Sequence, residues 1–315
     1  MNGVAAPIRA AFLDEGESAP LTDALRPRRS VSVVMVVYRT GEPLEQSLAC
    51  VLADPLVDEF VLVDNGSSPL EAERLRQLER DSRVVLVAGQ GNIGFARGAN
   101  LGAQTATGDL LVFLNPDAFL QGGCVAELVR EVEGTACPCI VGGRVLNADL
   151  TEQRGARRGE ITPVNALMSM SGLARAPAFR RFEVHWEDEA LPTEAACTPT
   201  ISGACFCMRR ADFQALGGFD EGYFLHVEDV DLCWRVREAG GVVLFHPRAE
   251  VIHIGGTSET PRLTVEFHKG VGLARYFRKR ADSVGQRLAA WLLSPLVVAL
   301  AVARPLVWRL KNRTA

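Results

Sequence analysis

The stretch Leu110-Leu-Val-Phe-Leu-Asn-Pro-Asp117 decides which fold we predict for this chain. Its five consecutive apolar residues predict a strand that is buried on both faces, as strands of parallel sheets are. Asp117 would leave that strand at its carboxyl end, where open α/β sheets bind their ligands. A carboxylate in that place can hold a divalent cation. Because Asn-Pro and Asp are also common in turns, the stretch alone leaves a plain turn open.

Segments with strand and helix patterns alternate along the chain, and the connections before Asp117 are short. This alternation predicts an α/β fold with a mostly parallel central sheet and helices on both faces. Before Asp117, the expected strands cover 31–38, 59–63, 83–88 and 109–114, and the expected helices cover 43–52, 69–80 and 94–105. After Asp117, the expected helices cover 121–133, 209–216 and 227–239, and the expected strands cover 140–145, 200–208, 242–245 and 250–253.

We divide the chain into an N-terminal extension over 1–29, an α/β domain over 30–262 and a C-terminal helical segment over 263–315. The extension shows no sustained hydrophobic period and no signal-peptide pattern. Residues 150–198 are weakly patterned for a segment inside a domain. We therefore expect them to be either a functional lid or a misassigned segment.

The composition excludes some classes of partner. The 315 residues carry a net charge of −4, which argues against nucleic acid because nucleic-acid binding requires a basic surface. The eight cysteines do not show the CxxC spacing of a zinc site. We therefore expect buried, reduced thiols and a cytoplasmic protein.

The C-terminal segment combines positive charge with an apolar run. Residues 275–313 hold nine Lys or Arg against one acid, which suggests an anionic membrane surface as neighbour. Residues 288–303 are uncharged but interrupted by Pro295, and they are shorter than the roughly 20 residues of a spanning helix. With Trp291 and Trp308 near its ends, this run predicts an interfacial or re-entrant segment, and a packing helix is the alternative.

Residues 89–94 spell the Gly-x-Gly-x-x-Gly pattern of dinucleotide-binding loops. In that fold the pattern follows the first strand, and an acid about 20 residues later holds the ribose. Here it follows the third expected strand, so an NAD-dependent oxidoreductase is retained only as an alternative. The same glycines can let the backbone approach a nucleotide, with Asn92, Arg97 and Asn100 pointing into one crevice.

Asp64 ends the second expected strand and begins Asp-Asn-Gly-Ser-Ser68. The local explanation is a turn followed by a helix cap, because Ser68 precedes Pro69. The functional explanation is that Asp64 accepts a hydrogen bond from a nucleotide base. The two explanations are compatible.

A dense group of acids begins the helix expected over 227–239. Glu228, Asp231 and Arg235 share one helix face, and Asp229 points elsewhere. The acids either stabilise the helix start through its dipole or include a general base at the mouth of a pocket. Later in the chain, His253 is either a structural residue or a metal ligand.

Taken in order, these motifs resemble those of the inverting glycosyltransferases of family 2, which have the GT-A fold, and more closely their rhamnosyltransferase-like branch. The resemblance covers about residues 31–260 and rests on the order of four motifs. The motifs are Asp64-Asn-Gly-Ser-Ser68, Asn92-Ile-Gly-Phe-Ala-Arg-Gly-Ala-Asn100, Asn115-Pro-Asp117 and Phe224-Leu-His-Val-Glu-Asp-Val-Asp-Leu-Cys-Trp-Arg235.

The resemblance implies a nucleotide-binding half over 30–120 and an acceptor half over 121–262. It implies that Asp229 and Glu228 are catalytic, with Asp229 as the general base. The implied ligands of Mg²⁺ or Mn²⁺ are Asp117 and His253, because Asn115 stands where the Asp-x-Asp motif has its first Asp. The implied donor-nucleotide contacts are Tyr38, Asp64, Asn92, Gly94, Arg97, Asn100 and Asn115.

The implied activity is transfer of a sugar with inversion from a nucleotide-diphosphate sugar, with dTDP-L-rhamnose as the first expected donor. The expected acceptor is a saccharide on a polyprenyl carrier, in the assembly of bacterial cell-surface polysaccharide. The enzyme would then work at the inner face of the cell membrane, held by its C-terminal segment. A catalytically silent protein that binds nucleotide sugars is a further alternative, because of Asn115.

Overall fold

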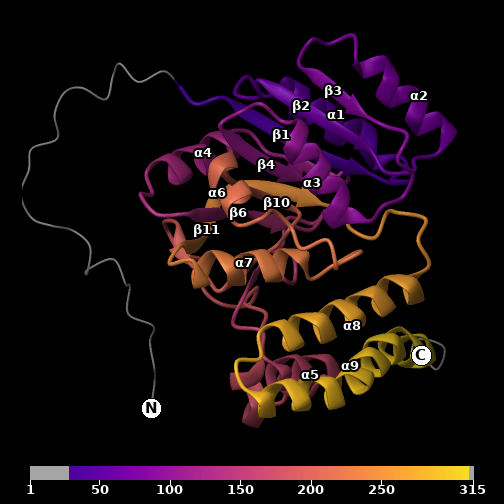
Figure 1. The fold of residues 1–315 in the computed structure, drawn as a ribbon, viewed down its shortest axis with the longest axis vertical. Helices are drawn as coiled ribbons and strands as arrows, with labels where there is room; N and C mark the ends of the chain where they lie inside the picture. Colours follow the sequence, from indigo (N-terminus) through magenta and orange to yellow (C-terminus); the bar gives the residue numbers. More distant parts are fainter. Residues whose placement is uncertain (1–27, 312–315) are drawn as a thin grey trace, which may run out of the picture.

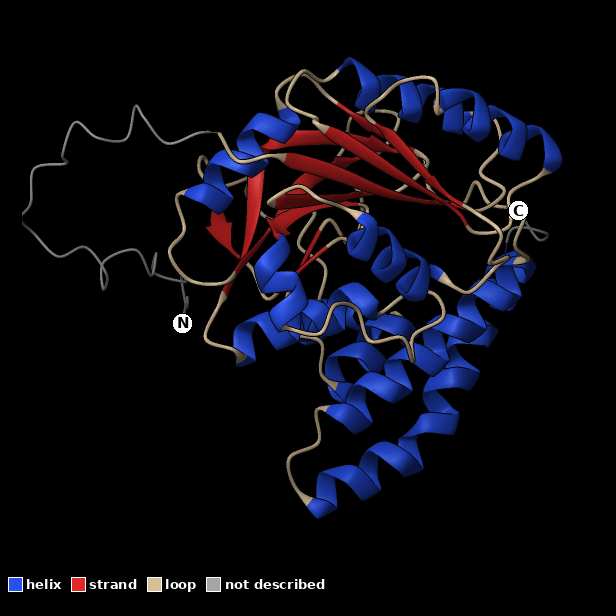
Figure 2. Cartoon of the chain, turned by 45° about the horizontal axis from the view of Figure 1, so that its top comes forward, coloured by secondary structure: helices blue, strands red, loops and turns tan. Residues whose placement is uncertain are grey.

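The computed structural model describes residues 28–311, with side chains described to Ala303. The expected extension over 1–29 therefore lies almost wholly outside the described residues. A nine-stranded sheet forms the centre of the molecule, in the order β3-β2-β1-β4-β10-β6-β11-β5 with β8 paired to β11 (Figures 1 and 2). Its strands are β1 (Val31–Val37), β2 (Glu59–Asp64), β3 (Val84–Val87), β4 (Leu110–Leu114), β5 (Ala118–Leu120), β6 (Cys139–Leu146), β8 (Ala196–Cys197), β10 (Cys205–Arg209) and β11 (Val242–His253).

Four of the eight strand pairs of this sheet are parallel and four are antiparallel, so the sheet is mixed where we expected it to be mostly parallel. β3, β2, β1 and β4 run in one direction, and β6 and β11 are parallel to each other. β10 is antiparallel to both β4 and β6, so the two parallel groups share one direction. β5 is antiparallel to β11. The carboxyl ends of β1, β2, β4 and β11 therefore meet at one edge of the sheet, together with the starts of β5 and β10.

Helices cover both faces of the sheet, which confirms the predicted fold class. α1 (Pro43–Ala53), α2 (Pro69–Leu78) and α4 (Cys124–Glu133) pack on one face, and α3 (Phe95–Thr105), α6 (Arg210–Ala215) and α7 (Glu228–Glu238) pack on the other. In β1, Val33 and Met35 face the first group of helices, whereas Val34 and Val36 face the second. This alternation buries the strand on both sides, as its uninterrupted apolar sequence requires.

Two of the expected strand boundaries are wrong. The strand predicted over 200–208 is two pieces, because β9 (Thr200–Ile201) pairs with β7 (Arg157–Arg158) in a small second sheet. A turn over 202–204 separates β9 from β10, and in it the Ser202 hydroxyl accepts a hydrogen bond from the Ala204 N–H (3.2 Å). The strands predicted over 242–245 and 250–253 are instead one strand, β11, with a bulge between His246 and Glu250.

The weakly patterned residues 150–198 are an ordered excursion from the sheet. They contain β7, α5 (Pro163–Ser171), the 3-10 helices η3 (Leu173–Arg175) and η4 (Pro177–Phe182), and β8. α5 lies in a layer with α8 (Arg262–Lys279) and α9 (Val284–Lys311), beyond α7 from the sheet (Figure 1). An apolar cluster that includes Ala166, Val230, Leu273 and Val297 joins this layer to α7.

α8 and α9 form an antiparallel hairpin. They approach closely at Gly270, where an added Cβ would lie 2.9 Å from the Cα of Val298. α9 continues past Pro295, so the interruption that we expected there is wrong. A proline removes one hydrogen bond from the helix, and packing of the surrounding turns against α8 can compensate for it. Within the described chain, Val284–Ala303 is the one helix long and apolar enough to cross a membrane.

The eight cysteines all lie in the described part of the chain and form no disulfide there. Five of them are buried, including Cys205 and Cys207, whose side chains face the same core cluster as predicted for one strand face. Cys197 is exposed, so the expectation of buried thiols fails at this position.

Candidate active site

Several candidate residues meet at the carboxyl edge of the sheet. Tyr38 directly follows β1, Asp64 ends β2 and Asn115 directly follows β4. His253 ends β11 and pairs with Ala118, the first residue of β5. This register brings His253 beside Asp117, although 136 positions of sequence, from 117 to 253, separate the two.

Asn115, Asp117 and His253 form one polar cluster at this edge. The Nε2 of His253 lies 3.2 Å from the Asp117 Oδ1 and 3.2 Å from the Asn115 Nδ2. The other Asp117 oxygen accepts a hydrogen bond from the Thr257 hydroxyl (2.9 Å). Burial alone would raise the pKa of Asp117, but His253 and Thr257 together lower it. Asp117 is therefore an anion at neutral pH although it is buried.

Gln153 determines which nitrogen of His253 faces this cluster. The Gln153 amide nitrogen donates to the His253 carbonyl (2.9 Å) and to the Asn147 Oδ1 (3.2 Å). Its oxygen therefore accepts from the His253 Nδ1–H (2.7 Å), which leaves Nε2 as the ring nitrogen that faces Asp117 and Asn115. An imidazole nitrogen and a carboxylate oxygen side by side are one nitrogen and one oxygen ligand for a divalent cation.

No group of three His, Cys, Asp or Glu side chains that could hold a metal occurs in residues 28–303. The candidate site has two such ligands, Asp117 and His253, and the amide of Asn115 beside them. The residues present therefore fit a divalent cation with Asn115 or further non-protein ligands completing the coordination.

Asp64 forms the turn that its sequence predicts. Its Oδ1 accepts hydrogen bonds from the N–H groups of Gly66 (3.1 Å) and Ser67 (2.8 Å). Ser68 then caps α2 in a capping box with Glu71, which confirms the expected cap. Tyr38 lies beside this turn, with its ring 3.6 Å from the Cβ position of Gly66. A contact from Asp64 or Tyr38 to a nucleotide base stays a prediction.

Four residues of the predicted nucleotide-contacting stretch instead contact other parts of the chain. The Asn92 side chain accepts from the Asn65 amide (3.3 Å), and Arg97 lies 3.6 Å from Glu221. Gly94 has a φ of +86°, and a Cβ on it would lie 2.7 Å from the Phe224 carbonyl oxygen. The contacts of Arg97 and Gly94 attach the start of α3 to the loop that precedes α7.

Asn100 also attaches α3 to the loop that precedes α7. Its amide nitrogen donates to the Phe219 carbonyl (2.9 Å), and its oxygen accepts from the Phe219 N–H (2.8 Å). Because the side chain is buried and both ends of the amide are used, the structure gives Asn100 a positioning role where we expected a polar group open to the crevice. The position of this loop matters because it leads directly into Glu228 and Asp229.

Asp229 is held by three donors at the start of α7. Its Oδ2 accepts from Arg158 (2.6 Å) and from the Gly203 N–H (3.1 Å), and its Oδ1 accepts from the Val230 N–H (2.8 Å). Burial raises the pKa of Asp229, but the charge and hydrogen bond of Arg158 and the Val230 N–H lower it overall. The carboxylate is therefore ionised at neutral pH and retains a free lone pair on Oδ1.

Glu228 differs from Asp229 although it is the adjacent residue. It is buried, and its Oε2 has no hydrogen-bond partner among the described residues. Burial and the Asp229 carboxylate raise the pKa of Glu228. Two neighbouring carboxyl groups with pKa values shifted in opposite directions are typical of functional sites.

Asp231 lies on the other face of α7 and holds the helix in place. Its buried carboxylate accepts from Arg235 (2.7 Å), from Lys279 of α8 (2.7 Å) and from the Tyr223 hydroxyl (3.2 Å). The predicted separation of Asp229 from the face of Asp231 is thus observed. In addition, His226 and Val227 have left-handed φ angles of 66° and 75°, so strained backbone leads into Glu228.

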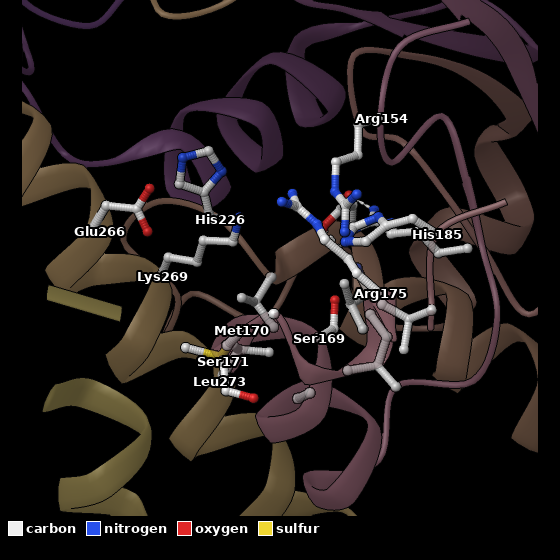
Figure 3. Close-up of a pocket in the computed structure, with 18 of the residues that line it drawn as sticks. Arg154, Ser169, Met170, Ser171, Arg175, His185, His226, Glu266, Lys269 and Leu273 are labelled. Atoms are coloured by element: carbon white, nitrogen blue, oxygen red, sulfur yellow. Dashed lines mark hydrogen bonds and ion pairs between the residues drawn. The ribbon is translucent and has the colours of Figure 1, made fainter. Parts of the chain in front are cut away.

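The turn over 202–204 connects the polar cluster to Asp229. The Asn115 N–H donates to the Ala204 carbonyl (2.9 Å), and the preceding residue, Gly203, donates to Asp229. Asp229 also lines a cavity of about 570 Å³, together with Arg158, His226 and residues of α5 and α8 (Figure 3). Asp64 and Asp117 do not line this cavity. The edge cluster and Asp229 are therefore both hydrogen-bonded to one turn.

Arg158, Gln153 and Thr257 are functional candidates that the sequence did not indicate. Arg158 and Gln153 fall in the weakly patterned residues 150–198, where no period or motif marks them. The only available signal was the pair Arg157-Arg158 in a chain whose candidate base is an acid. Their partners Asp229 and His253 lie 71 and 100 positions away.

A family model described as "Glycosyl transferase family 2" matches residues 32–217. An N-acetylglucosaminyl-diphospho-decaprenol L-rhamnosyltransferase of Mycobacterium tuberculosis H37Rv is 28% identical over 235 residues, 70% of this chain and 75% of that protein. The rhamnosyltransferase WbbL of Escherichia coli K12 is 22% identical over 238 residues, which cover 71% of this chain and 83% of WbbL.

Two solved structures share the fold. GalNAc-T7 with UDP, GalNAc and Mn²⁺ has a TM-score of 0.59 at 19% identity, over 79% of this chain and 48% of that chain. The mannosyltransferase PcManGT of Pyrobaculum calidifontis, with GDP-Man and Mn²⁺, has a TM-score of 0.56 at 17% identity, over 88% of this chain and 74% of that one. The present chain thus spans just under half of GalNAc-T7. These similarities confirm the predicted GT-A fold.

Proposed function

The chain belongs to glycosyl transferase family 2, and on this premise we propose that it moves L-rhamnose, with inversion, from dTDP-L-rhamnose to a saccharide carried on a polyprenyl diphosphate. The observation that carries the proposal is that the turn over 202–204 hydrogen-bonds both to Asn115, in the cluster of Asp117, and to Asp229, so that one turn joins two ionised carboxylates. Asp117 can bind a cation beside the departing diphosphate, and Asp229 can take the proton of the attacking hydroxyl.

The choice of sugar and acceptor rests on the relatives. The mycobacterial relative is a rhamnosyltransferase, and its name specifies an N-acetylglucosaminyl-diphospho-decaprenol substrate. WbbL of Escherichia coli is also a rhamnosyltransferase. Both fold neighbours contain a nucleotide or nucleotide sugar together with Mn²⁺. These facts support a nucleotide-sugar donor, a lipid-linked acceptor and Mg²⁺ or Mn²⁺ in the present chain.

In the proposed reaction, Oδ1 of Asp229 takes the proton of the acceptor hydroxyl while that oxygen forms a bond to the anomeric carbon. The bond from the anomeric carbon to the donor diphosphate breaks, and its electron pair leaves with the nucleoside diphosphate. Arg158 keeps the Asp229 carboxylate ionised and oriented through Oδ2. A divalent cation, when bound by Asp117 and His253, would supply positive charge next to the diphosphate.

We propose that the enzyme works at the inner face of the cell membrane, and the surface of α8 and α9 supports a membrane contact. Large apolar side chains are exposed along both helices. They include Leu263 and Phe267 of α8 and Leu288, Trp291, Leu292 and Leu296 of α9. Arg278 lies 4.5 Å from the centre of the Trp291 ring, so positive charge accompanies this surface. An apolar helix face with cations and Trp beside it suits a membrane interface.

The deciding experiment measures donor binding and turnover in parallel. Thermal shift with dTDP, dTDP-L-rhamnose, UDP- and GDP-sugars and NAD(H), each with and without Mn²⁺, should show stabilisation by the dTDP compounds that depends on Mn²⁺. Asp117→Ala should lose that dependence, whereas Glu79→Ala, an exposed acid at the end of α2, should keep it.

Three outcomes would contradict the proposal. Stabilisation by NAD(H) alone would favour the oxidoreductase alternative. Binding of dTDP-L-rhamnose without any sugar transfer, across a panel of lipid-linked acceptors, would favour the silent binding protein. Unchanged Mn²⁺-dependent binding by Asp117→Ala would remove Asp117 from the metal site and leave the family membership untouched.

A further inference from the structure

The cavity that Asp229 lines is unusually rich in positive charge. It lies between the 150–198 excursion and the helices α7 and α8, and its volume is about 570 Å³. Two acids, Asp229 and Glu266, line it. Five cations line it, namely Arg154, Arg158, Arg175, Arg262 and Lys269. A cavity of this size can hold a ligand of several hundred Å³, such as a sugar with a diphosphate.

The cations of this cavity differ in how they are paired. Arg158 pairs with Asp229 (2.6 Å), and Arg154 pairs with Glu183 (3.1 Å) and Glu187 (3.2 Å). Arg175, at the end of η3, is exposed and has no ion pair among the described residues. Figure 3 shows Arg175 and Arg154 on one side of the cavity and Lys269 on the other. Arg175 can therefore bind an anionic ligand without breaking an existing ion pair.

Two histidines, His185 and His226, lie in the wall of this cavity. Burial and the charges of Arg154 and Arg158 lower the pKa of His185 to about 3. The His185 ring is therefore neutral at physiological pH, and its Nδ1 is a buried polar atom without a described partner. These walls favour an anion and offer it hydrogen bonds.

Part of the cavity lining is apolar. It includes Ile161, Met170 and Leu273, which lie on the excursion, α5 and α8. The same two helices carry the exposed apolar residues Val164 and Phe267. A ligand that enters from this layer would thus pass from apolar helices, across a cationic wall, to Asp229.

We propose that this cavity is the acceptor subsite and that Arg154, Arg175 and Lys269 bind the diphosphate of a lipid-linked acceptor. The inference rests on the proposed function, because it takes Asp229 as the base that meets the acceptor hydroxyl. The lipid end leaves along α5 and α8, and the sugar lies between the diphosphate and Asp229. Guanidinium groups suit this task because they bind phosphate oxygens in pairs.

The test uses farnesyl diphosphate, below the concentration at which it forms micelles, as a probe for the full chain. Binding is measured by calorimetry under two conditions. EDTA removes the metal from the donor site, and saturating dTDP with Mn²⁺ fills that site. We expect saturable binding in both conditions. Arg175→Glu should weaken it by at least about tenfold, as for loss of one charge-assisted hydrogen bond. Arg180→Glu is the matched control, because Arg180 is an exposed arginine of η4 that does not line the cavity.

Several results would overturn the proposal. Equal affinity of wild type and Arg175→Glu would do so, as would displacement of the probe by dTDP with Mn²⁺. Equal binding of farnesol would show a lipid site without diphosphate recognition. Equal binding of inorganic pyrophosphate would retain the diphosphate site and refute the lipid path along α5 and α8. If dTDP with Mn²⁺ fails to bind while the probe still depends on Arg175, the proposed function fails and the diphosphate site stands.

Discussion

Replacing Asp229 by Asn should stop sugar transfer while the protein stays folded. An amide oxygen in the place of Oδ2 can accept from both Arg158 and the Gly203 N–H, as the carboxylate does. The amide nitrogen would then face the Val230 N–H, which now donates to Oδ1. One buried donor loses its acceptor, and Arg158 loses a full negative charge. We expect the free energy of unfolding to fall by about 1–3 kcal/mol.

The effect on turnover should be much larger than the effect on stability. An amide cannot take the proton of the acceptor hydroxyl, so transfer should slow by roughly 10²–10⁴-fold. The matched control is Glu228→Gln, which removes the neighbouring carboxyl group from the same helix. Because burial and Asp229 raise the pKa of Glu228 to about 8, its carboxyl group is mostly protonated at neutral pH and cannot take a proton, so its variant should lose less than about tenfold.

The assay compares single-turnover transfer of labelled sugar with Mn²⁺-dependent binding of dTDP and with unfolding in denaturant. We expect Asp229→Asn to bind dTDP as the wild type does. If Asp229→Asn retained transfer within about tenfold of wild type while Glu228→Gln lost it, the assignment of the base would be reversed. Loss of donor binding with a normal single-turnover rate would move Asp229 out of the chemical step.

Three further predictions test the metal cluster, the loop before α7 and the membrane surface. Gln153→Leu should weaken Mn²⁺ binding by about 10–100-fold, because His253 loses its supporting acceptor; calorimetry giving unchanged affinity would refute this. Burial raises the pKa of Asp220, but Lys279 and Arg275 lower it from 3.8 to about 2, so its contribution to stability is present above pH 3.8 and is lost as pH falls through about 2. The free energy of unfolding should therefore fall by about 2 kcal/mol more in wild type than in Asp220→Asn over that range, and parallel curves would contradict the ion pairs. Trp291→Asn with Leu292→Asn should reduce co-sedimentation with anionic vesicles, whereas Leu70→Asn, at an 82% exposed leucine on α2, should not; equal binding by all three proteins would leave α9 a packing role.

Local patterns predicted the framework of the molecule correctly. Apolar runs such as Leu110–Leu114 and Val31–Val37 became strands buried on both faces, and the alternation of elements produced the parallel groups of the sheet. The errors occurred where a boundary depends on distant parts of the chain. The break at 202–204 exists because β9 and β10 pair in different sheets, and α9 continues through Pro295 because it packs on α8.

Among the candidate site residues, too, the sequence indicated some correctly and could not show the contacts of others. The order of motifs indicated Asp117, His253 and Asp229 as functional, and the structure brings the first two together. Their roles in the reaction stay predictions. The sequence could not show that the Asn100 amide is hydrogen-bonded to the Phe219 backbone. The two residues are 119 positions apart, and no local pattern links them.

By itself, the sequence determined the strands, the helices and the family, because hydrophobic period and motif order are local properties of a chain. Only the tertiary structure decided that Arg158 holds Asp229, that Gln153 orients His253 and that cations line the cavity beside the base. Those contacts depend on strand register and on how the 150–198 excursion packs against α7 and α8. Both are set by the core as a whole, and no single segment encodes them.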